Sequence, residues 1–438
     1  MSTSTGQERL SAGAARARRF YGDDLATSDP AVAEAIGREE RRQRDQIELI
    51  APKNYMSRAA RQALSSILSF TSVEGYPGRR YHAGTINLDA VESLAIERAC
   101  ELFRCRYANL QPHSGTQANQ AVFFALLEPG DTVLSMDLSS GGHLSHGLKS
   151  NLSGRWFRVV TYGVRSEDGM LDYEQAEELC RTHRPKLIVV GGSSYPRAVD
   201  FERFRRMADE VGAHLLADIC HFSGLVAGGV HPHPFPHAHV ITTTTNKNLR
   251  GPRGGLVLAD DDDIGRRLAS AVFPGIQGGP LPEFISAKAV ALGEALRPEF
   301  VEYARAVLEN ARTVCDVLAR RGYAIVTGGT DTPLAVVDLR PKGLTGDVAS
   351  ESLERAGIPC NKNLVPGDTE KPSVTSGLRI GTSAVTTRGL RTDELRHVAG
   401  LVADVLDAVG DPEVEAAVRA EVDVLCRRFP LYDLEPAP

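Results

Sequence analysis

Between residues 130 and 260, short apolar runs alternate with longer helical stretches along the chain. The runs are rich in β-branched residues and show little polar alternation, which is typical of strands buried on both faces. Strands separated by helices require crossover connections, so the pattern predicts a mostly parallel sheet with helices on both faces. The predicted strands are Thr132–Met136, Arg158–Tyr162, Lys186–Val190, His214–Ala217, Val240–Thr245 and Leu256–Leu258.

A strong helical periodicity precedes these strands and begins at Asp89. Asp89 and Glu92 have the spacing of a capping box, in which the two side chains bond the first free amides of a helix. We therefore predict a helix that starts at Asp89 and buries one apolar face. The apolar positions with helical spacing are Val91, Leu94, Ala95, Ala99 and Leu102.

The pattern changes after Pro298. A long helical segment, Glu299 to Arg321, leads into two short apolar runs, and a terminal helix is predicted from Thr392 to about Val409. This arrangement predicts a smaller α+β domain joined to the first by a long helix. We expect an N-terminal arm at 1–46, a large domain at 47–297 and a small C-terminal domain at 298–438. The two runs are Tyr323–Thr327 and Leu334–Leu339, and a Gly/Pro-rich stretch follows at 359–376.

The composition describes a soluble globular protein. The 438 residues include 50 Lys and Arg against 56 Asp and Glu, a net charge of −6, and 42% are hydrophobic. This length supports a large core without a metal or disulfide staple, and the mild acidity argues against nucleic acid or an anionic membrane as partner. Small molecules are the better expectation, and no metal site is expected.

The cysteine pattern and the N-terminus bear on location. Seven cysteines without a CxxC pair do not indicate a disulfide framework, and no run of about 18 apolar residues predicts a membrane span. We therefore expect a cytoplasmic protein. Residues 1–20 loosely resemble a transit peptide in their Ser, Ala and Arg content, but we interpret them as a frayed terminal arm.

Two features suggest a site for a phosphorylated cofactor. Pro112–Gln117 is a small polar loop that runs into an apolar helical stretch, where amides and hydroxyls could hold a phosphate, although the same pattern suits an ordinary helix N-cap. Asp218 ends a buried apolar run, where a carboxylate is costly unless it meets a cation such as a protonated pyridine nitrogen. Ligands bind at such strand ends in open α/β sheets.

Two further features complete the set. Lys247 follows the run Val240–Thr245, where partial burial would favour Schiff-base chemistry, although a lysine at a strand end is more often simply solvated. Gly141-Gly142-His143 places an imidazole on a glycine turn, where it could stack on a flat ring or serve a structural role. A phosphate nest, a stacking ring, an acid and an amine together are the parts that hold pyridoxal phosphate.

Several segments resemble the serine hydroxymethyltransferase family, and the resemblance runs from about Ile47 to Ala408. It implies an α/β protein of the aspartate-aminotransferase-like pyridoxal-phosphate fold, with a mostly parallel seven-stranded large domain and a smaller α+β C-terminal domain. It also implies a homodimer, or a tetramer, in which each active site uses residues of both subunits. The segments that carry the resemblance are Glu74–Tyr81, Gln111–Asn119, Gly141–Gly147, Thr242–Gly255, Phe273–Pro280 and Val374–Gly381.

The resemblance assigns roles around the cofactor. Lys247 would bind its aldehyde, Asp218 its ring nitrogen, and His143 would stack on the ring. Ser193 and His221 would lie near the phenolic oxygen, with His221 among the catalytic residues. The residues expected at the phosphate and its surroundings are Ser114, Gly115, Thr116 and Thr244, with Gly278 and Gly279 of the neighbouring subunit.

The substrates follow from the same resemblance. Arg379 would bind the α-carboxylate of a serine- or glycine-type amino acid as a bidentate pair. Glu74 of the neighbour, beside Tyr81, would handle the proton of the substrate hydroxyl or of the folate intermediate. Tetrahydrofolate would carry the one-carbon unit. The folate pocket is expected at Leu138, Gly141, Gly142, Leu144 and Asn363, with Tyr81.

Six positions depart from the family pattern, and we expect them to line one pocket. The changes favour either altered substrate choice, in which Lys53 and His82 contact the substrate, or a restored pocket, in which Lys53 pairs with a nearby acid. Losing a phosphate-binding tyrosine at position 72 should weaken cofactor retention by about 1.5–3 kcal/mol. The departures are Pro52 for serine, Lys53 for glutamate, Ser72 and His82 for tyrosine, Asn246 for histidine and Asn248 for threonine.

These observations support a pyridoxal-phosphate enzyme that makes or breaks the Cα–Cβ bond of a serine- or glycine-type amino acid with tetrahydrofolate. A specialised paralogue with another substrate is one variant of this hypothesis. The alternative is a folate-independent threonine aldolase or transaldolase that joins a glycyl carbanion to another aldehyde. A catalytically silent relative is less consistent with the sequence, because Lys247, Asp218, His143 and Arg379 are all present.

Overall fold

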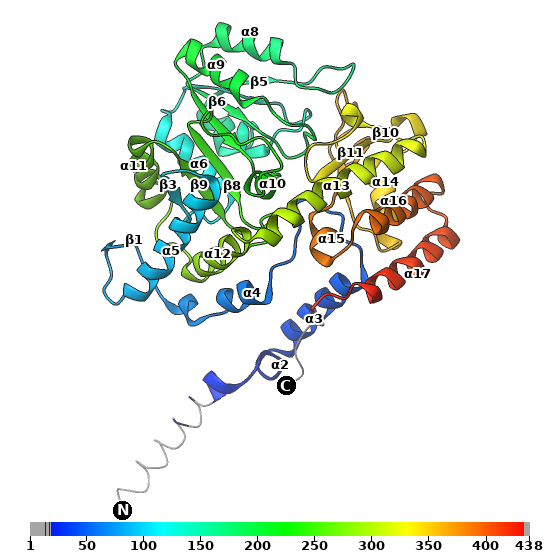
Figure 1. The fold of residues 1–438 in the computed structure, drawn as a ribbon, viewed down its shortest axis with the longest axis horizontal. Coiled ribbons are helices and arrows are strands. Elements are labelled where there is room, and N and C mark those ends of the chain that lie inside the picture. The colour runs from blue at the N-terminus through cyan, green and yellow to red at the C-terminus, as the bar shows by residue number, and fades with distance from the viewer. Residues whose placement is uncertain (1–13, 15–16, 18, 433–438) are drawn as a thin grey trace, which may run out of the picture.

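The structure is a computed structural model that describes residues 14, 17 and 19–432. The predicted frayed arm at 1–20 falls mainly outside the described residues. Helix α2 (Leu25–Ser28) and the start of α3 (Pro30–Asp45) extend away from the two packed parts of the chain (Figure 1). Asp29 caps α3, since its side chain accepts a hydrogen bond from the amide of Val32 and Pro30 follows at the first helical position.

A seven-stranded sheet of order β3-β9-β8-β7-β6-β4-β5 forms the large part of the chain. The strands from β8 to β5 run parallel, whereas β9 and β3 are antiparallel to their neighbours. The mostly parallel sheet is thus confirmed. The six predicted strands are all present, and their predicted ends lie within two residues of the observed ends. The apolar runs did not reveal β3, which has only three residues. The strands are β3 (Tyr107–Asn109), β4 (Thr132–Met136), β5 (Arg158–Tyr162), β6 (Leu187–Val190), β7 (His214–Asp218), β8 (Val240–Thr244) and β9 (Gly255–Ala259).

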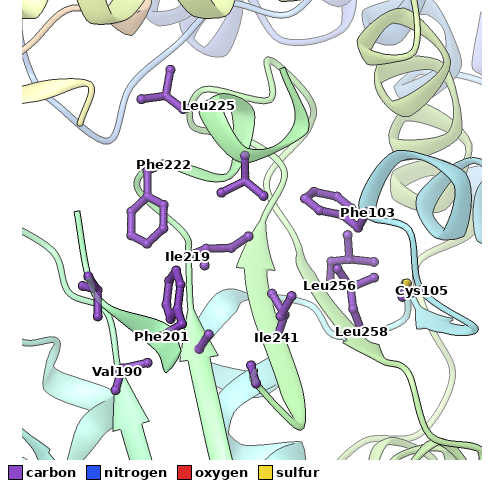
Figure 2. Packing of buried hydrophobic residues seen from close by; sticks show 14 of the residues in the cluster. Phe103, Cys105, Val190, Phe201, Ile219, Phe222, Leu225, Ile241, Leu256 and Leu258 are labelled. Carbon is purple, nitrogen blue, oxygen red and sulfur yellow. The ribbon is translucent and has the colours of Figure 1, made fainter. Parts of the chain in front are cut away.

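Both faces of this sheet are covered. Ile188 and Val190 of β6 belong to one hydrophobic cluster, and the alternating Leu187 and Val189 belong to another. Successive side chains of a strand point to opposite faces, so continuous apolar runs feed two cores at once. Figure 2 shows side chains of the first cluster, to which Val190 and Ile241 of the sheet contribute together with Phe201 and Phe222.

Helices cover the two faces and join the strands (Figure 1). No helix of the described residues is long and apolar enough to cross a membrane. The helices of this part are α4 (Arg58–Leu64), α5 (Ile86–Phe103), α6 (Gly115–Leu126), α7 (Leu152–Trp156), α8 (Tyr173–His183), α9 (Phe201–Val211), α10 (Ser223–Ala227), α11 (Asp262–Ser270) and α12 (Pro282–Ala295).

The predicted start of α5 is wrong. The helix begins at Ile86, and its N-cap residue Thr85 makes no side-chain capping bond. Asp89 and Glu92 do not form a capping box, because both carboxylates accept hydrogen bonds from Arg80. Arg80 lies in a short hairpin of β1 (Gly75–Tyr76) and β2 (Arg79–Arg80), so the two acids hold this hairpin against the helix.

A second, antiparallel sheet of order β10-β11-β13-β12 forms the small part. The long helix α13 (Pro298–Arg320) leads into it, as predicted, but the helix expected to end the chain is followed by another, α17. The segment that contains Ile47 and Leu49 packs in this second core, and the amide of Gly381 donates to the carbonyl of Leu49 at 2.8 Å. The elements are β10 (Ala324–Ile325), β11 (Leu334–Asp338), β12 (Asn361–Asn363), β13 (Gly377–Gly381), α14 (Gly346–Arg355), α15 (Ser383–Arg388), α16 (Thr392–Asp407) and α17 (Pro412–Arg428).

Candidate active site

One cavity of about 280 Å³ lies at the carboxyl ends of the parallel strands. Asp218 ends β7, Lys247 follows β8 and Ser193 follows β6, so adjacent strands deliver these residues to the same edge. Arg379 reaches the cavity from β13 of the small sheet. The lining residues are Pro52, Ser114, Gly115, Thr116, His143, Gly192, Ser193, Asp218, Cys220, His221, Thr244, Asn246, Lys247, Arg253 and Arg379.

The N-terminus of α6 forms one wall of the cavity. Ser114 is the N-cap, and its Oγ accepts a hydrogen bond from the amide of Gln117 at 3.2 Å. The ordinary N-cap interpretation therefore holds, but the amides of Gly115 and Thr116, in the first turn, have no intrahelical acceptor and line the cavity. The Oγ1 atom of Thr244 is buried without a partner among the described residues. These donors and the positive helix end fit a phosphate group.

Asp218 is held as a carboxylate in a buried place. Its Oδ2 accepts from His146 Nε2 and from Asn119 Nδ2, both at 2.9 Å, and its Oδ1 accepts from the amide of Cys220 at 3.1 Å. Burial acts to raise the pKa of Asp218, but the bond and charge of His146, followed by His143 and Asn119, hold it well below its usual range. An ionised carboxylate here fits the protonated nitrogen of a pyridine ring.

Two imidazoles in the cavity are neutral. Burial lowers the pKa of His143 to about 4, and its Nδ1 lies 2.7 Å from Ser145 Oγ at the start of η2 (Leu144–His146). Burial also lowers the pKa of His221 well below its usual range, with the charges of Lys247 and Arg379 acting in the same direction. Neutral rings suit stacking on an aromatic cofactor and exchange of hydrogen bonds with its oxygen.

The loop that carries Lys247 is fixed by two asparagines. Asn54 Nδ2 donates to the carbonyl of Lys247 at 2.9 Å and to the hydroxyl of Tyr303 at 2.9 Å. Asn248 Oδ1 accepts from the amide of Gly224 at 2.7 Å, and its Nδ2 donates to the carbonyl of His221 at 3.1 Å. These bonds hold the chain at Lys247 and at the residue that follows it, so a fixed turn directs the Lys247 side chain.

Arg379 is oriented by two bonds from its guanidinium. Its Nη1 donates to the carbonyl of Ser193 at 2.8 Å, and its Nη2 donates to Asn361 Oδ1 at 3.3 Å. Its Nε is buried without a partner among the described residues. Burial lowers the pKa of Arg379 to about 10, so the group stays charged at neutral pH. A fixed guanidinium with unused donors fits a substrate carboxylate.

The glycine turn before His143 packs directly against the loop after β6. Gly141 has φ +109°, and a Cβ there would lie 2.7 Å from the amide nitrogen of Tyr195. Its carbonyl accepts from the amide of Ser193 at 2.7 Å. The close approach of two backbones therefore requires glycine at this position and places His143 beside Ser193.

Another group of predicted residues lies together outside this cavity. A Cβ on Gly278 would lie 3.7 Å from Glu74 Oε1, and one on Gly279 would lie 2.6 Å from the carbonyl oxygen of Val73. The amide of Tyr81 donates to the carbonyl of Glu74 at 3.1 Å, and its side chain is 75% exposed. Within this chain, these residues therefore contribute to a surface and not to the cavity.

Only some of the residues predicted to bind folate lie close to one another. Leu138 lines a second cavity of about 450 Å³ that shares His143 with the first. Leu144 is 43% exposed nearby, and Gly141 and Gly142 are buried in the turn. Asn363 lies on β12 of the small sheet, where its Nδ2 donates to the carbonyl of Leu364.

Comparisons with known proteins decide the family. The family model described as serine hydroxymethyltransferase matches residues 25–402. The chain is 58% identical over 418 residues to the serine hydroxymethyltransferase of Paramagnetospirillum magneticum, covering 94% of this chain and 98% of that relative. The chain belongs to the serine hydroxymethyltransferase family.

Other relatives agree. The serine hydroxymethyltransferase of Rhodospirillum centenum is 58% identical, with 94% of this chain and 98% of the relative covered. Serine hydroxymethyltransferase 2 of Rhodospirillum rubrum is 54% identical, with 94% and 97% covered. Members of this family are pyridoxal-phosphate enzymes that transfer one-carbon units with tetrahydrofolate as carrier, and the residues of the cavity fit that cofactor. The aldolase alternative is not favoured.

The structure corrects the expectation that all departures from the serine hydroxymethyltransferase pattern line one pocket. Pro52 and Asn246 do line the cavity. The ammonium of Lys53 instead donates a hydrogen bond to the carboxylate of Glu48 at 2.9 Å, so Lys53 pairs with a nearby acid. The side chain of Asn248 is occupied by hydrogen bonds to the backbone. The two remaining departures, Ser72 and His82, are exposed.

Two residues that contact Asp218 were assigned no role from the sequence, although both lie within serine hydroxymethyltransferase motifs. Asn119 lies on α6 and His146 in η2, far from Asp218 along the chain. A signal existed for Asn119, because it is a polar residue within the apolar stretch that follows the phosphate loop. His146 is buried and 1% exposed, and its place three residues after His143 was the only hint.

Proposed function

We propose that this chain interconverts L-serine and glycine with tetrahydrofolate as the acceptor or donor of the one-carbon unit. The observation that carries the proposal is a single cavity that unites Lys247, ionised Asp218, neutral His143 and the oriented guanidinium of Arg379. Each group matches one requirement of an amino-acid substrate held on pyridoxal phosphate.

The roles of the residues follow from their surroundings. Pyridoxal phosphate, when bound, draws electrons from Cα of the amino acid, so that the Cα–Cβ bond can break. Arg379 binds the substrate carboxylate through donors left after its bonds to Ser193 and Asn361. Asp218 keeps a proton on the ring nitrogen because its own pKa is held low.

The remaining cavity residues hold the cofactor. Lys247 supplies the amine for its aldehyde, and Ser114, Gly115, Thr116 and Thr244 bind the phosphate. His143 covers the ring, while Ser193 and His221 face its phenolic oxygen.

We also propose a homodimer in which each subunit completes its partner's site. The hairpin and loop that carry Glu74, Tyr81, Gly278 and Gly279 lie outside the protomer's own cavity. Large apolar side chains are exposed beside them, and such patches mark interfaces. Glu74 and Tyr81 would reach the partner's substrate and folate, and the two glycines would reach its phosphate. The exposed apolar side chains are Ile67 (78%), Phe70 (86%), Tyr81 (75%) and Ile86 (79%).

The wider organisation follows the same proposal. We propose an arm at 1–46, a large domain at 47–297 and a small domain at 298–438 around the cavity, with the first residues of the large-domain range, Ile47 and Leu49, packed in the core of the small domain. Folate would bind beside His143, near Leu138, Gly141, Gly142, Leu144 and Asn363. The location we propose is the cytoplasm.

Pro52 supports one refinement of the activity. It replaces a serine that helps hold the substrate carboxylate in the family and it lines the cavity, so the carboxylate loses one hydroxyl donor on that side. A weaker grip on the carboxylate raises KM without changing the bond-breaking step. We expect normal chemistry with L-serine at a raised KM, and Pro52→Ser should lower that KM.

The visible spectrum of the purified protein with pyridoxal phosphate tests the proposal. Adding glycine should produce a long-wavelength band, and this band should grow when tetrahydrofolate is added, because the two binding sites are coupled. Lys247→Arg is the matched control and should show neither response. Glycine binding without any effect of tetrahydrofolate would overturn the folate assignment and revive the aldolase alternative.

A further inference from the structure

Lys288 is a buried cation whose ammonium lies against the chain that leads into the phosphate loop. The residue lies on α12, is 2% exposed and belongs to no part of the cavity lining. Its Nζ donates to the carbonyl oxygens of Leu110 at 2.6 Å, Gly255 at 2.9 Å and Pro112 at 3.3 Å. Three acceptors therefore meet the three N–H donors of one ammonium group.

Side chains bond each of the three carbonyls in the segment from Leu110 to Pro112. Lys288 donates hydrogen bonds to the carbonyls of Leu110 and Pro112, and Gln277 Nε2 donates to the intervening carbonyl of Gln111 at 2.8 Å. Carbonyls of an extended segment alternate in direction, so the two side chains hold it from opposite sides. Ser114, the N-cap of the cavity helix, comes only two residues after Pro112.

The glycines opposite Lys288 complete this arrangement. A Cβ on Gly254 would overlap with Lys288 Cε, and a Cβ on Gly255 would overlap with the carbonyl oxygen of Ser114. The amide of Gly255 also donates to the carbonyl of Pro112 at 2.9 Å. The start of β9, the phosphate loop and Lys288 are thus in direct mutual contact.

We propose that Lys288 is a positioning residue for the cofactor phosphate, acting through the backbone of residues 110–114 rather than by touching the phosphate. This rests on the proposed binding of pyridoxal phosphate in the cavity. The ammonium fixes the loop so that Ser114, Gly115 and Thr116 present their donors in one geometry. Burial lowers the pKa of Lys288 to about 7, partly opposed by the charge of Glu92, while the three acceptors suit the protonated form.

The test compares binding of pyridoxal phosphate with binding of pyridoxal, which lacks the phosphate, by titration of visible absorbance. Lys288→Met removes the donors but keeps the length of the side chain. We expect it to weaken pyridoxal phosphate binding about tenfold or more and pyridoxal binding by less than about threefold, because only the phosphate depends on the loop. A fall in general stability would weaken both ligands alike.

Arg388→Met is the matched control. Arg388 is another buried cation bonded to carbonyls, but it lies in the small part, at the ends of α3 and α17. Its loss should lower the melting temperature without changing the ratio of the two affinities. A Lys288→Met protein with the wild-type ratio would overturn the proposal, as would an equal change of the ratio in Arg388→Met.

A second variant covers the case in which Lys288→Met does not fold. Gly254→Ala keeps the charge but pushes on Lys288 Cε, and we expect the same selective loss of pyridoxal phosphate affinity. An unchanged ratio in this variant would also contradict the proposal. Failure of the proposed function would look different, because the wild-type protein would then give no absorbance of bound cofactor with either ligand.

Discussion

Replacing Asn119 by aspartate changes one polar atom beside Asp218 into a charged oxygen. Asn119 Nδ2 lies 2.9 Å from Asp218 Oδ2, and Asn119 Oδ1 accepts from the hydroxyl of Thr242 at 2.6 Å. In Asn119→Asp, two carboxylates would face each other at hydrogen-bond distance. Two ionised carboxylates at such a distance would repel by about 6 kcal/mol at an effective dielectric constant of about 20.

This repulsion raises the pKa for loss of the last proton from the carboxyl pair, from the acid range into the neutral range. One carboxyl therefore stays protonated at neutral pH, and the pair shares one negative charge. Support for the protonated ring nitrogen then weakens, so we expect kcat with L-serine to fall at pH about 6–7 and to recover as pH rises to about 9. The sign follows because the one negative charge of the protonated pair is divided between two carboxyl groups, and raising pH removes the shared proton and restores the full charge on Asp218.

The assay is the pH profile of kcat with L-serine and tetrahydrofolate for wild type, Asn119→Asp and Asn119→Ala. The alanine variant loses the same hydrogen bond without adding a charge, so it should be slower at every pH without gaining a new alkaline recovery. A folded, cofactor-loaded Asn119→Asp protein whose profile runs parallel to wild type would refute the reasoning, because sharing one charge with residue 119 would then not weaken the support that Asp218 gives to the ring nitrogen.

Three further predictions concern retention and stability. Ser72→Tyr should restore a charge-assisted bond to the partner's phosphate worth about 1.5–3 kcal/mol, and it should slow cofactor loss on dialysis tenfold or more. Equal cofactor retention by wild type and Ser72→Tyr would show that another group already fills this role. Arg388→Met removes donors to the carbonyls of Arg44, Gln46 and Phe429, and the free energy of unfolding in urea should fall by about 3 kcal/mol, whereas a loss below about 1 kcal/mol would mean that water replaces these bonds. The bond from Arg355, followed by that from Ser352, lowers the pKa of Glu415 from 4.5 to about 2. The ionised group therefore stabilises the fold above pH 4.5 and loses this effect as pH falls toward 2. Glu415→Gln should be less stable than wild type at neutral pH, and the difference in stability should close below pH 4.5. A difference in stability that stays constant with pH would contradict this.

The sequence alone determined the main sheet and the cofactor-binding edge. Runs such as Thr132–Met136 and Val240–Thr244 are β-branched or apolar because both faces of each strand are covered, and this local property can be read without the fold. Asp218 and Lys247 follow directly from two of these runs. Their meeting at one edge is a consequence of parallel strands, so the candidate site was predictable once the strands were recognised.

Only the tertiary structure decided how the polar groups pair. Asp218 is held by Asn119 and His146, which are 99 and 72 residues away along the chain. Glu92 matched a capping box locally, but its buried carboxylate binds Arg80 and Gln111, because the free energy of a buried charge depends on the partners that packing brings to it.

The same reason separates Lys53 from Lys288. The sequence left Lys53 as either a substrate ligand or the partner of a nearby acid, and the structure places Glu48 2.9 Å from it. Lys288 had no motif role, yet three carbonyls converge on its ammonium because α12, β9 and the chain after β3 pack together. Hydrophobic periodicity can be read from residues that are neighbours in the sequence, whereas the partner of a charged group depends on contacts between elements that lie far apart in the sequence.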